Sequence, residues 1–532
     1  MSTAPAATFT ATGRLTRFTV RRDRVRIVVW VAAVVLLVAS TVASVKGLYP
    51  TQADLDAAAA ASRDNAAAII FNGPAQSLDT VGGQVAFQTG TWGLIVMGLM
   101  SVFMLGRLTR GEEEAGRAEL VRSLPVGLHA PAAAAMITVA TMNVVAGALV
   151  AVVSAGLGLP VAGSVAFGLS FTAFGLFMAA VTAVAAQVTD NTRVVYGVGG
   201  LVLGAAFVVR AIGDIGSGAL SWLSPIGWAQ KLRPWAGETW WPLLVIMGAT
   251  GVLAWVVFTL SRRRDLGAGL VAPRAGPARA SRWLASPLGL ATRLQRGSLI
   301  GWAGALVVLA AAYGSVADAI DEFVKDNQAL SDIIAAQGGG TLQQQYVAMS
   351  FRVLALVAAG FAVQSVLRVR SEETAGRADL VLATPVGRTR FASGHLVLAF
   401  GASAAILGAM GVAFALSDAM VRGDFGAVGT TIVAAAIYVP AVWLLAGLTV
   451  ALVGLAPRVC AAAWGVLGVC FVIGMFGQLL GLPHVVEQLS PFESVPDYPA
   501  VAFDGVPLVV LTLGAAVLTA VGLAGLRRRD LG

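Results

Sequence analysis

Long uninterrupted apolar runs alternate with short charged segments along the whole chain. A helix rises about 1.5 Å per residue, so about 20 apolar residues cross a hydrocarbon core of about 30 Å. Each run is expected to be a helix, because lipid cannot hydrogen-bond to the backbone and the runs are too uniformly apolar for barrel strands. The predicted spans are residues 27–46, 86–106, 131–157, 161–188, 194–213, 242–261, 298–316, 347–367, 393–416, 428–455, 459–481 and 505–526. The predicted fold class is an all-α polytopic membrane protein with about 12 transmembrane helices.

Composition agrees with a chain that lies in lipid. The 532 residues are 57% hydrophobic and 12% charged, whereas soluble domains are roughly half apolar and about one-quarter charged. Of the 36 basic residues, 28 lie on the termini and the even-numbered connections between spans. Cytoplasmic loops retain Lys and Arg, so both termini are expected inside a multi-pass protein of the inner (plasma) membrane. The pI of about 10.1 then reflects membrane topology, and no nucleic-acid partner is expected.

One polar segment occurs twice in the chain. Residues 110–127 and 370–387 align at a constant offset of 260, and 12 of the 18 positions are identical. Shorter matches keep the same order: residues 262–267 and 527–532 both read Arg-Arg-Arg-Asp-Leu-Gly. The chain is therefore expected to be an internal duplication.

The duplication predicts the domain organisation. Residues 1–265 and 297–532 would each hold six spans, and residues 266–296, rich in Pro, Gly, Ala and Arg, would form a cytoplasmic linker. Because six is even, both halves enter the membrane in the same orientation. This predicts two parallel six-helix repeats around a pseudo-two-fold axis along the membrane normal, with a central pathway between them.

The repeated segment is the strongest candidate for a functional surface. Glu113, Gly116, Arg117 and Leu120 fall at i, i+3, i+4 and i+7, which predicts one face of a helix ending near Pro125. A solvated loop whose Glu and Arg pair with each other and with headgroups is the alternative, but such a loop needs only charge, and 12 of 18 residues are retained. The expected docking residues are Glu112, Glu113, Gly116, Arg117 and Leu120 in the first copy and Glu372, Glu373, Gly376, Arg377 and Leu380 in the second.

At these residues the chain resembles the permeases of the second class of ABC exporters, whose loop after the second span forms a coupling helix on the nucleotide-binding subunit. The double-length form and residues 223–230 and 233–242 are similar to the actinobacterial exporters of polyketide antibiotics, the tetronasin-resistance type, which act in multidrug efflux. The second copy keeps Ser490-Pro491 but loses the tryptophans of that stretch. The resemblance implies an export permease for hydrophobic antibiotics and drugs.

The chain carries no sequence motif for ATP hydrolysis. A phosphate-binding loop ends in Gly-Lys-Ser/Thr, and none of the lysines Lys46, Lys231 and Lys325 follows a glycine. We therefore expect a transport subunit without catalytic residues, without a cofactor of its own and without a metal site, since the three histidines show no ligand spacing. ATP and Mg would be bound by two copies of a separate ABC nucleotide-binding subunit, one for each repeated loop.

The resemblance also implies where substrate passes, since the family lines its pathway with the second and fifth span of each half. The candidate pathway residues are Trp92, Met97, Met100, Phe103, Met104, Tyr196, Phe207, Phe351, Phe361, Trp464, Phe471, Met475 and Phe476. Thioethers and aromatic rings suit large, variable, apolar ligands, although interhelix packing explains any one of them equally well. Arg210 and Asp214 are expected to pair, and Arg352 would either neutralise an anionic substrate or reach the interface.

Two other functions remain open at this point. A secondary transporter of parallel six-span repeats would need coupling-ion residues within the bilayer, and charges are scarce in these spans. An ABC exporter of a lipid or a siderophore would show the same loops. A neighbouring gene for an ATPase subunit distinguishes the first alternative from an ABC exporter.

The charge asymmetry makes a topological prediction. Residues 266–296 and both termini should be cytoplasmic, and residues 47–85 and 317–346 should be outside. An Ala280→Cys variant in intact cells should therefore resist a membrane-impermeant maleimide, while a cysteine within 47–85 should react. Strong labelling at position 280 would contradict the assignment.

Overall fold

The computed structural model describes residues 8–63, 66–216, 218–262, 269–271, 278–325, 340–476 and 483–529. Among these residues there are helices and no strands, and eleven helices are long and apolar enough to cross a membrane. The prediction of an all-α polytopic membrane protein is confirmed. The predicted span at 459–481 contains the shorter apolar helix Ala462–Gly474, and residues 477–482 lie outside the described part of the chain.

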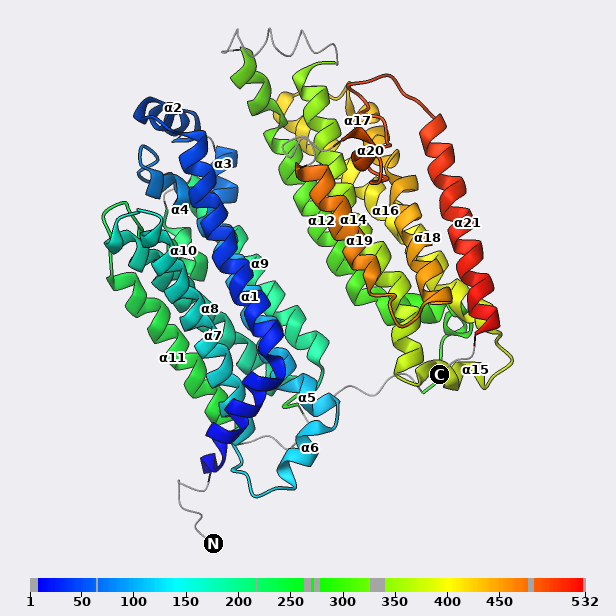
Figure 1. Cartoon of the computed structure of the whole chain (residues 1–532), viewed down its shortest axis with the longest axis horizontal. Helices are drawn as coiled ribbons and strands as arrows, with labels where there is room; N and C mark the ends of the chain where they lie inside the picture. The colour runs from blue at the N-terminus through cyan, green and yellow to red at the C-terminus, as the bar shows by residue number, and fades with distance from the viewer. Residues whose placement is uncertain are drawn as a thin grey trace. The chain divides into compact units, whose positions relative to one another are not determined.

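The chain forms two compact units, Met1–Gly276 and Pro277–Gly532, drawn in blue to green and in green to red (Figure 1). The helices of the first unit are α1 (Thr12–Leu48), α2 (Gln52–Arg63), α3 (Ala66–Asn72), α4 (Val81–Leu108), α5 (Arg110–Glu114), α6 (Arg117–Arg122), α7 (Ala130–Gly156), α8 (Val161–Val188), α9 (Thr192–Ile215), η2 (Leu220–Leu223), α10 (Pro225–Gln230) and α11 (Trp241–Ser261).

The helices of the second unit are η3 (Arg282–Ala285), α12 (Pro287–Lys325), α14 (Leu342–Thr374), α15 (Arg377–Leu382), α16 (Arg388–Arg422), α17 (Val428–Ala436), α18 (Val439–Leu455), α19 (Ala462–Phe476), α20 (His484–Glu487) and α21 (Val506–Arg528). The main packing partners correspond between the units. In the first, α1 packs on α7 and α4, and α8 packs on α4 and α11; in the second, α12 packs on α16 and α14, and α18 packs on α14 and α21.

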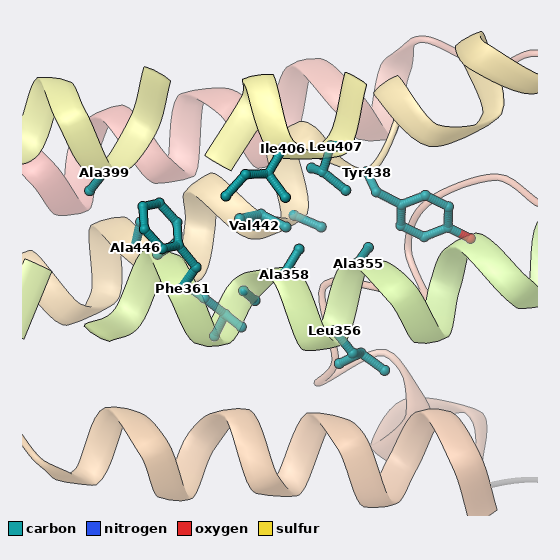
Figure 2. Close-up of a cluster of buried hydrophobic side chains, with 14 of the residues drawn as sticks. Ala355, Leu356, Ala358, Phe361, Ala399, Ile406, Leu407, Tyr438, Val442 and Ala446 are labelled. Carbon is teal, nitrogen blue, oxygen red and sulfur yellow. The ribbon is translucent and has the colours of Figure 1, made fainter. Parts of the chain in front are cut away.

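Each unit has its own apolar core. In the first unit the α1 valines Val34, Val38, Val42 and Val45 are fully buried and lie on one helical face. In the second unit, α14, α16 and α18 meet around Phe361, Ile406 and Val442, among others (Figure 2). A helix in lipid gains its packing energy from close contact rather than from leaving water, so these complementary faces fix the bundle.

Glycines set the closest helix approaches, as expected for packing in a membrane. A Cβ atom at Gly454 of α18 would overlap the carbonyl of Gly522 of α21. A Cβ atom at Gly168 of α8 would overlap the carbonyl of Gly147 of α7. Larger side chains at these positions would separate the helices.

Two boundaries differ from the sequence expectation. The predicted linker 266–296 is too long, because α12 begins at Pro287, where the Ser286 hydroxyl accepts a hydrogen bond from the N–H of Gly289 at 3.0 Å. The predicted span 428–455 is two helices, α17 and α18. The break falls before Pro440, which has no N–H to donate to the carbonyl of residue 436.

Candidate functional site

The first copy of the repeated segment, loop 1 (residues 110–127), follows α4 at the end of the first unit that also holds the start of α1 (Figure 1). Helix α5 ends at Glu114 and α6 begins at Arg117. Between them Gly116 has a φ of 69°, in the left-handed region that a right-handed helix cannot contain. The predicted continuous helical face from Glu113 to Leu120 is therefore wrong.

The second copy, loop 2 (residues 370–387), breaks at the same place. Helix α14 ends at Thr374, Gly376 has a φ of 67°, and α15 begins at Arg377. A Cβ atom at Gly116 or Gly376 would meet nothing within 4 Å. Within this chain both glycines are therefore required for a backbone conformation and not for a close approach.

The carboxylates of loop 1 are turned toward arginines of the same loop. Arg117 Nε donates to Glu112 at 2.8 Å, and Arg110 Nη1 donates to Glu113 at 2.7 Å. The Arg110 side chain is 1% exposed, and its Nε donates to the carbonyl of Ala186 at the end of α8 at 2.6 Å. The hydrogen bond with Glu112 raises the pKa of Arg117, so this pair stays ionised at neutral pH.

Loop 2 repeats both ion pairs. Arg377 Nε donates to Glu372 at 2.6 Å, and Arg370 Nη1 donates to Glu373 at 3.0 Å. The side chains of Glu372 and Glu373 are only 4% and 5% exposed. These acids are compensated inside the chain, so they give each loop its shape and leave other side chains to face a partner.

The outward face of each loop carries a leucine. Leu120 of α6 is 71% exposed and Leu380 of α15 is 76% exposed, and the two occupy the same position of the repeat. Gly116 and Arg117, with Gly376 and Arg377 in the second copy, are also exposed. A leucine at the tip of a polar loop gains nothing from water, so its recurrence points to a partner surface.

The candidate pathway residues divide by burial. Five are in the core of their own unit: Met97, Met100, Met104, Phe351 and Phe361. Four are at least 40% exposed, namely Trp92, Phe103, Trp464 and Phe471, and Tyr196 and Phe207 are half-buried. The side chains of Met475 and Phe476 lie outside the described part. A route between two units needs side chains on a unit's surface, so the exposed and half-buried residues are the remaining candidates.

In both units aromatic side chains gather on the face formed by the first, second and fifth long helices. In the first unit Phe103 of α4 stacks on Trp30 of α1 at 6.3 Å and meets Tyr196 of α9 edge to face at 5.3 Å, between ring centroids. In the second unit Trp302 of α12 donates to Gln364 of α14 at 2.7 Å, and Trp464 of α19 lies near Gly360.

Buried arginines tie the other ends of the bundles. The predicted pair of Arg210 and Asp214 is confirmed at 3.4 Å, and Arg210 Nη2 also donates to the carbonyl of Ile70 at 2.7 Å. Arg352 pairs with Glu493 at 2.9 Å and with Asp497. Both expectations for Arg352, an anionic substrate or the interface, are replaced by partners that sequence reasoning missed, and no local spacing could have found them.

Helices of this length and apolarity, in two units with corresponding packing and a recurring polar loop, define a polytopic membrane protein. Residues 284–527 match the family model described as multidrug efflux system permease Rv1217c, C-terminal domain. Over 526 residues the chain is 40% identical to the multidrug efflux system permease protein Rv1217c of Mycobacterium tuberculosis, which covers 98% of this chain and 96% of that protein. The chain belongs to this family of multidrug efflux permeases.

The left-handed glycine gives a direct test of the loop conformation. Asparagine tolerates a positive φ, whereas a β-branched residue there costs about 1–2 kcal/mol. Gly116→Val should therefore speed tryptic cleavage after Arg117 in the purified chain, and Gly116→Asn should cleave at nearly the normal rate. Equal acceleration by both substitutions would mean that the glycine is needed for space and not for its φ.

Proposed function

We propose that this chain is the membrane-spanning permease subunit of an ATP-driven ABC exporter. It would move hydrophobic antibiotics and drugs out of the cell along a central pathway between its two halves. ATP and Mg would be bound by two copies of a separate nucleotide-binding subunit, docked on loop 1 and loop 2. The chain would lie in the inner membrane with both termini in the cytoplasm and with its halves as parallel six-helix repeats.

The observation that carries this proposal is the matched pair of exposed leucines. Leu120 and Leu380 share one position of the repeat, are 71% and 76% exposed, and stand on loops braced by the same ion pairs. Fully burying a leucine is worth roughly 1.5–3 kcal/mol. Two identical surfaces on one chain suit two identical partner subunits, which is the requirement of a permease that already contains both halves.

The energy source follows from what the sequence lacks. Transport against a gradient needs a coupled reaction, and this chain has no Gly-Lys-Ser/Thr loop to hold the β- and γ-phosphates of ATP. The repeated loops then receive the movement of the partner, and their buried Arg–Glu pairs would pass it to α4 and α14 as rigid levers. The purified chain alone is accordingly a transport subunit without ATPase activity.

The proposed substrate class rests on the aromatic faces and on the family. Exposed rings such as Trp92, Phe103 and Trp464 offer broad apolar contact without fixed hydrogen-bond geometry. This chemistry suits large hydrophobic compounds of varied shape, in agreement with the printed function of the mycobacterial relative, a multidrug efflux permease. No charged relay is required of the spans in this mechanism, in contrast to an ion-coupled transporter.

The docking role predicts the effect of removing both leucines. Leu120→Asp with Leu380→Asp should leave insertion and folding intact, because both side chains face outward. It should abolish co-purification with the ATPase encoded beside the permease, and with it drug-stimulated ATP hydrolysis and efflux. Leu223→Asp serves as the control, since Leu223 is also 71% exposed but lies outside the loops. Normal co-purification and efflux in the double variant would refute the docking role.

A further inference from the structure

The two loops share their internal ion pairs but not the contacts that hold them to the rest of the chain. We propose that the two ends of the chain are positioning segments for these loops. Residues 8–10 and Arg22 hold loop 1, whereas Arg529 holds loop 2. The two docking surfaces are therefore mechanically inequivalent although their sequences match. The consequence for transport rests on the proposed function, while the bracing itself does not.

Loop 1 is tied to the N-terminal segment by its backbone. The N–H of Gly127 donates to the carbonyl of Thr10 at 3.0 Å, and the N–H of His129 donates to the carbonyl of Thr8 at 3.1 Å. The approach is so close that a Cβ atom at Gly127 would overlap the carbonyl of Thr8. Phe9 then packs its ring on His129, with 5.8 Å between centroids.

A charged contact adds a second tie between α1 and loop 1. Arg22 Nη1 donates to Glu112 at 3.0 Å, at the carboxylate that Arg117 also holds. Glu112 therefore connects α6 to α1. A movement of α1 relative to α4 would be felt at loop 1 through this carboxylate and through residues 8–10.

Loop 2 is tied to the opposite end of the chain. Arg529, just after α21, donates from Nη2 to both carboxylate oxygens of Glu373, each at 2.7 Å. Arg388, at the start of α16, donates to the backbone carbonyl of Arg529 at 2.6 Å. Arg529 is 14% exposed, so this contact is shielded from water and retains more of its strength than a surface pair.

Two comparisons within the chain separate this bracing from general features of the sequence. Gly127 and Gly387 occupy the same repeat position, yet a Cβ atom at Gly387 would meet nothing within 4 Å. Arg527 and Arg528 precede Arg529 in one basic run, yet both are exposed. A role in membrane topology would be shared by all three arginines, whereas bracing belongs to Arg529 alone.

The reason for two different braces lies in the connectivity. In each loop the internal pairs, Arg110 with Glu113 and Arg370 with Glu373, are local and fix only the shape of the loop. Its position relative to the bundle has to come from contacts with other elements. The first unit supplies them from its first helix and the second unit from its last, so loop 1 follows α1 and loop 2 follows α21.

The test is amide hydrogen–deuterium exchange of the purified full-length chain, followed over both loops. Arg529→Gln should raise exchange in loop 2 by about tenfold, the factor for one lost hydrogen bond to a charged group, and leave loop 1 unchanged. Gly127→Ala should do the reverse. Arg528→Gln and Gly387→Ala are the matched controls and should change neither loop. Arg529→Lys, which keeps the charge, should retain most of the protection.

Equal changes in both loops, or no change with either variant, would overturn the inference. Efflux of ethidium from cells that also produce the ATPase separates this result from the docking proposal. Lost efflux in Arg529→Gln, with normal membrane insertion and rescue by Arg529→Lys, supports the positioning role in transport. Normal efflux with a freed loop 2 would overturn docking at that loop, while the brace itself would stand.

Discussion

Lipid cannot hydrogen-bond to a peptide group or to a charge, and most of this structure depends on that constraint. It forces the apolar runs into helices and makes every polar group inside the bundle find a partner within the chain. Fully buried Arg210 meets Asp214 and two backbone carbonyls of α3, and Arg352 meets Glu493 and Asp497. Burial raises the pKa of Glu493, so its partner arginine is what keeps that carboxylate charged.

The same constraint decides what the sequence can predict. Apolar length and the basic asymmetry are properties of single segments, so the helices were predictable from the sequence alone. Arg210 and Asp214 lie four residues apart on one helix and were predictable for the same reason. Arg352 and Glu493 are 141 residues apart, and no pattern along one chain joins them. The break at Gly116 was missed because helical spacing continues across it; glycine in both copies was its only signal.

The loops show how duplicated sequence can serve two different surroundings. The repeat keeps the residues that shape each loop, the arginine–glutamate pairs and the left-handed glycine, and it keeps the exposed leucine. The contacts to the bundle are supplied by the two chain ends, which are not repeated in the same way. A permease of this kind can present two equal surfaces to its partners and still respond through two different helices, α1 and α21.

The central claim is that one chain presents two docking surfaces to two separate ATPase subunits. Native mass spectrometry of the complex, purified from its own membrane in a mild detergent, measures this directly. The expected mass is that of one permease of 54.3 kDa with two ATPase subunits, and Leu380→Asp alone should leave one. A complex with two permease chains, or the intact permease without any ATPase at concentrations that support efflux, would contradict the claim.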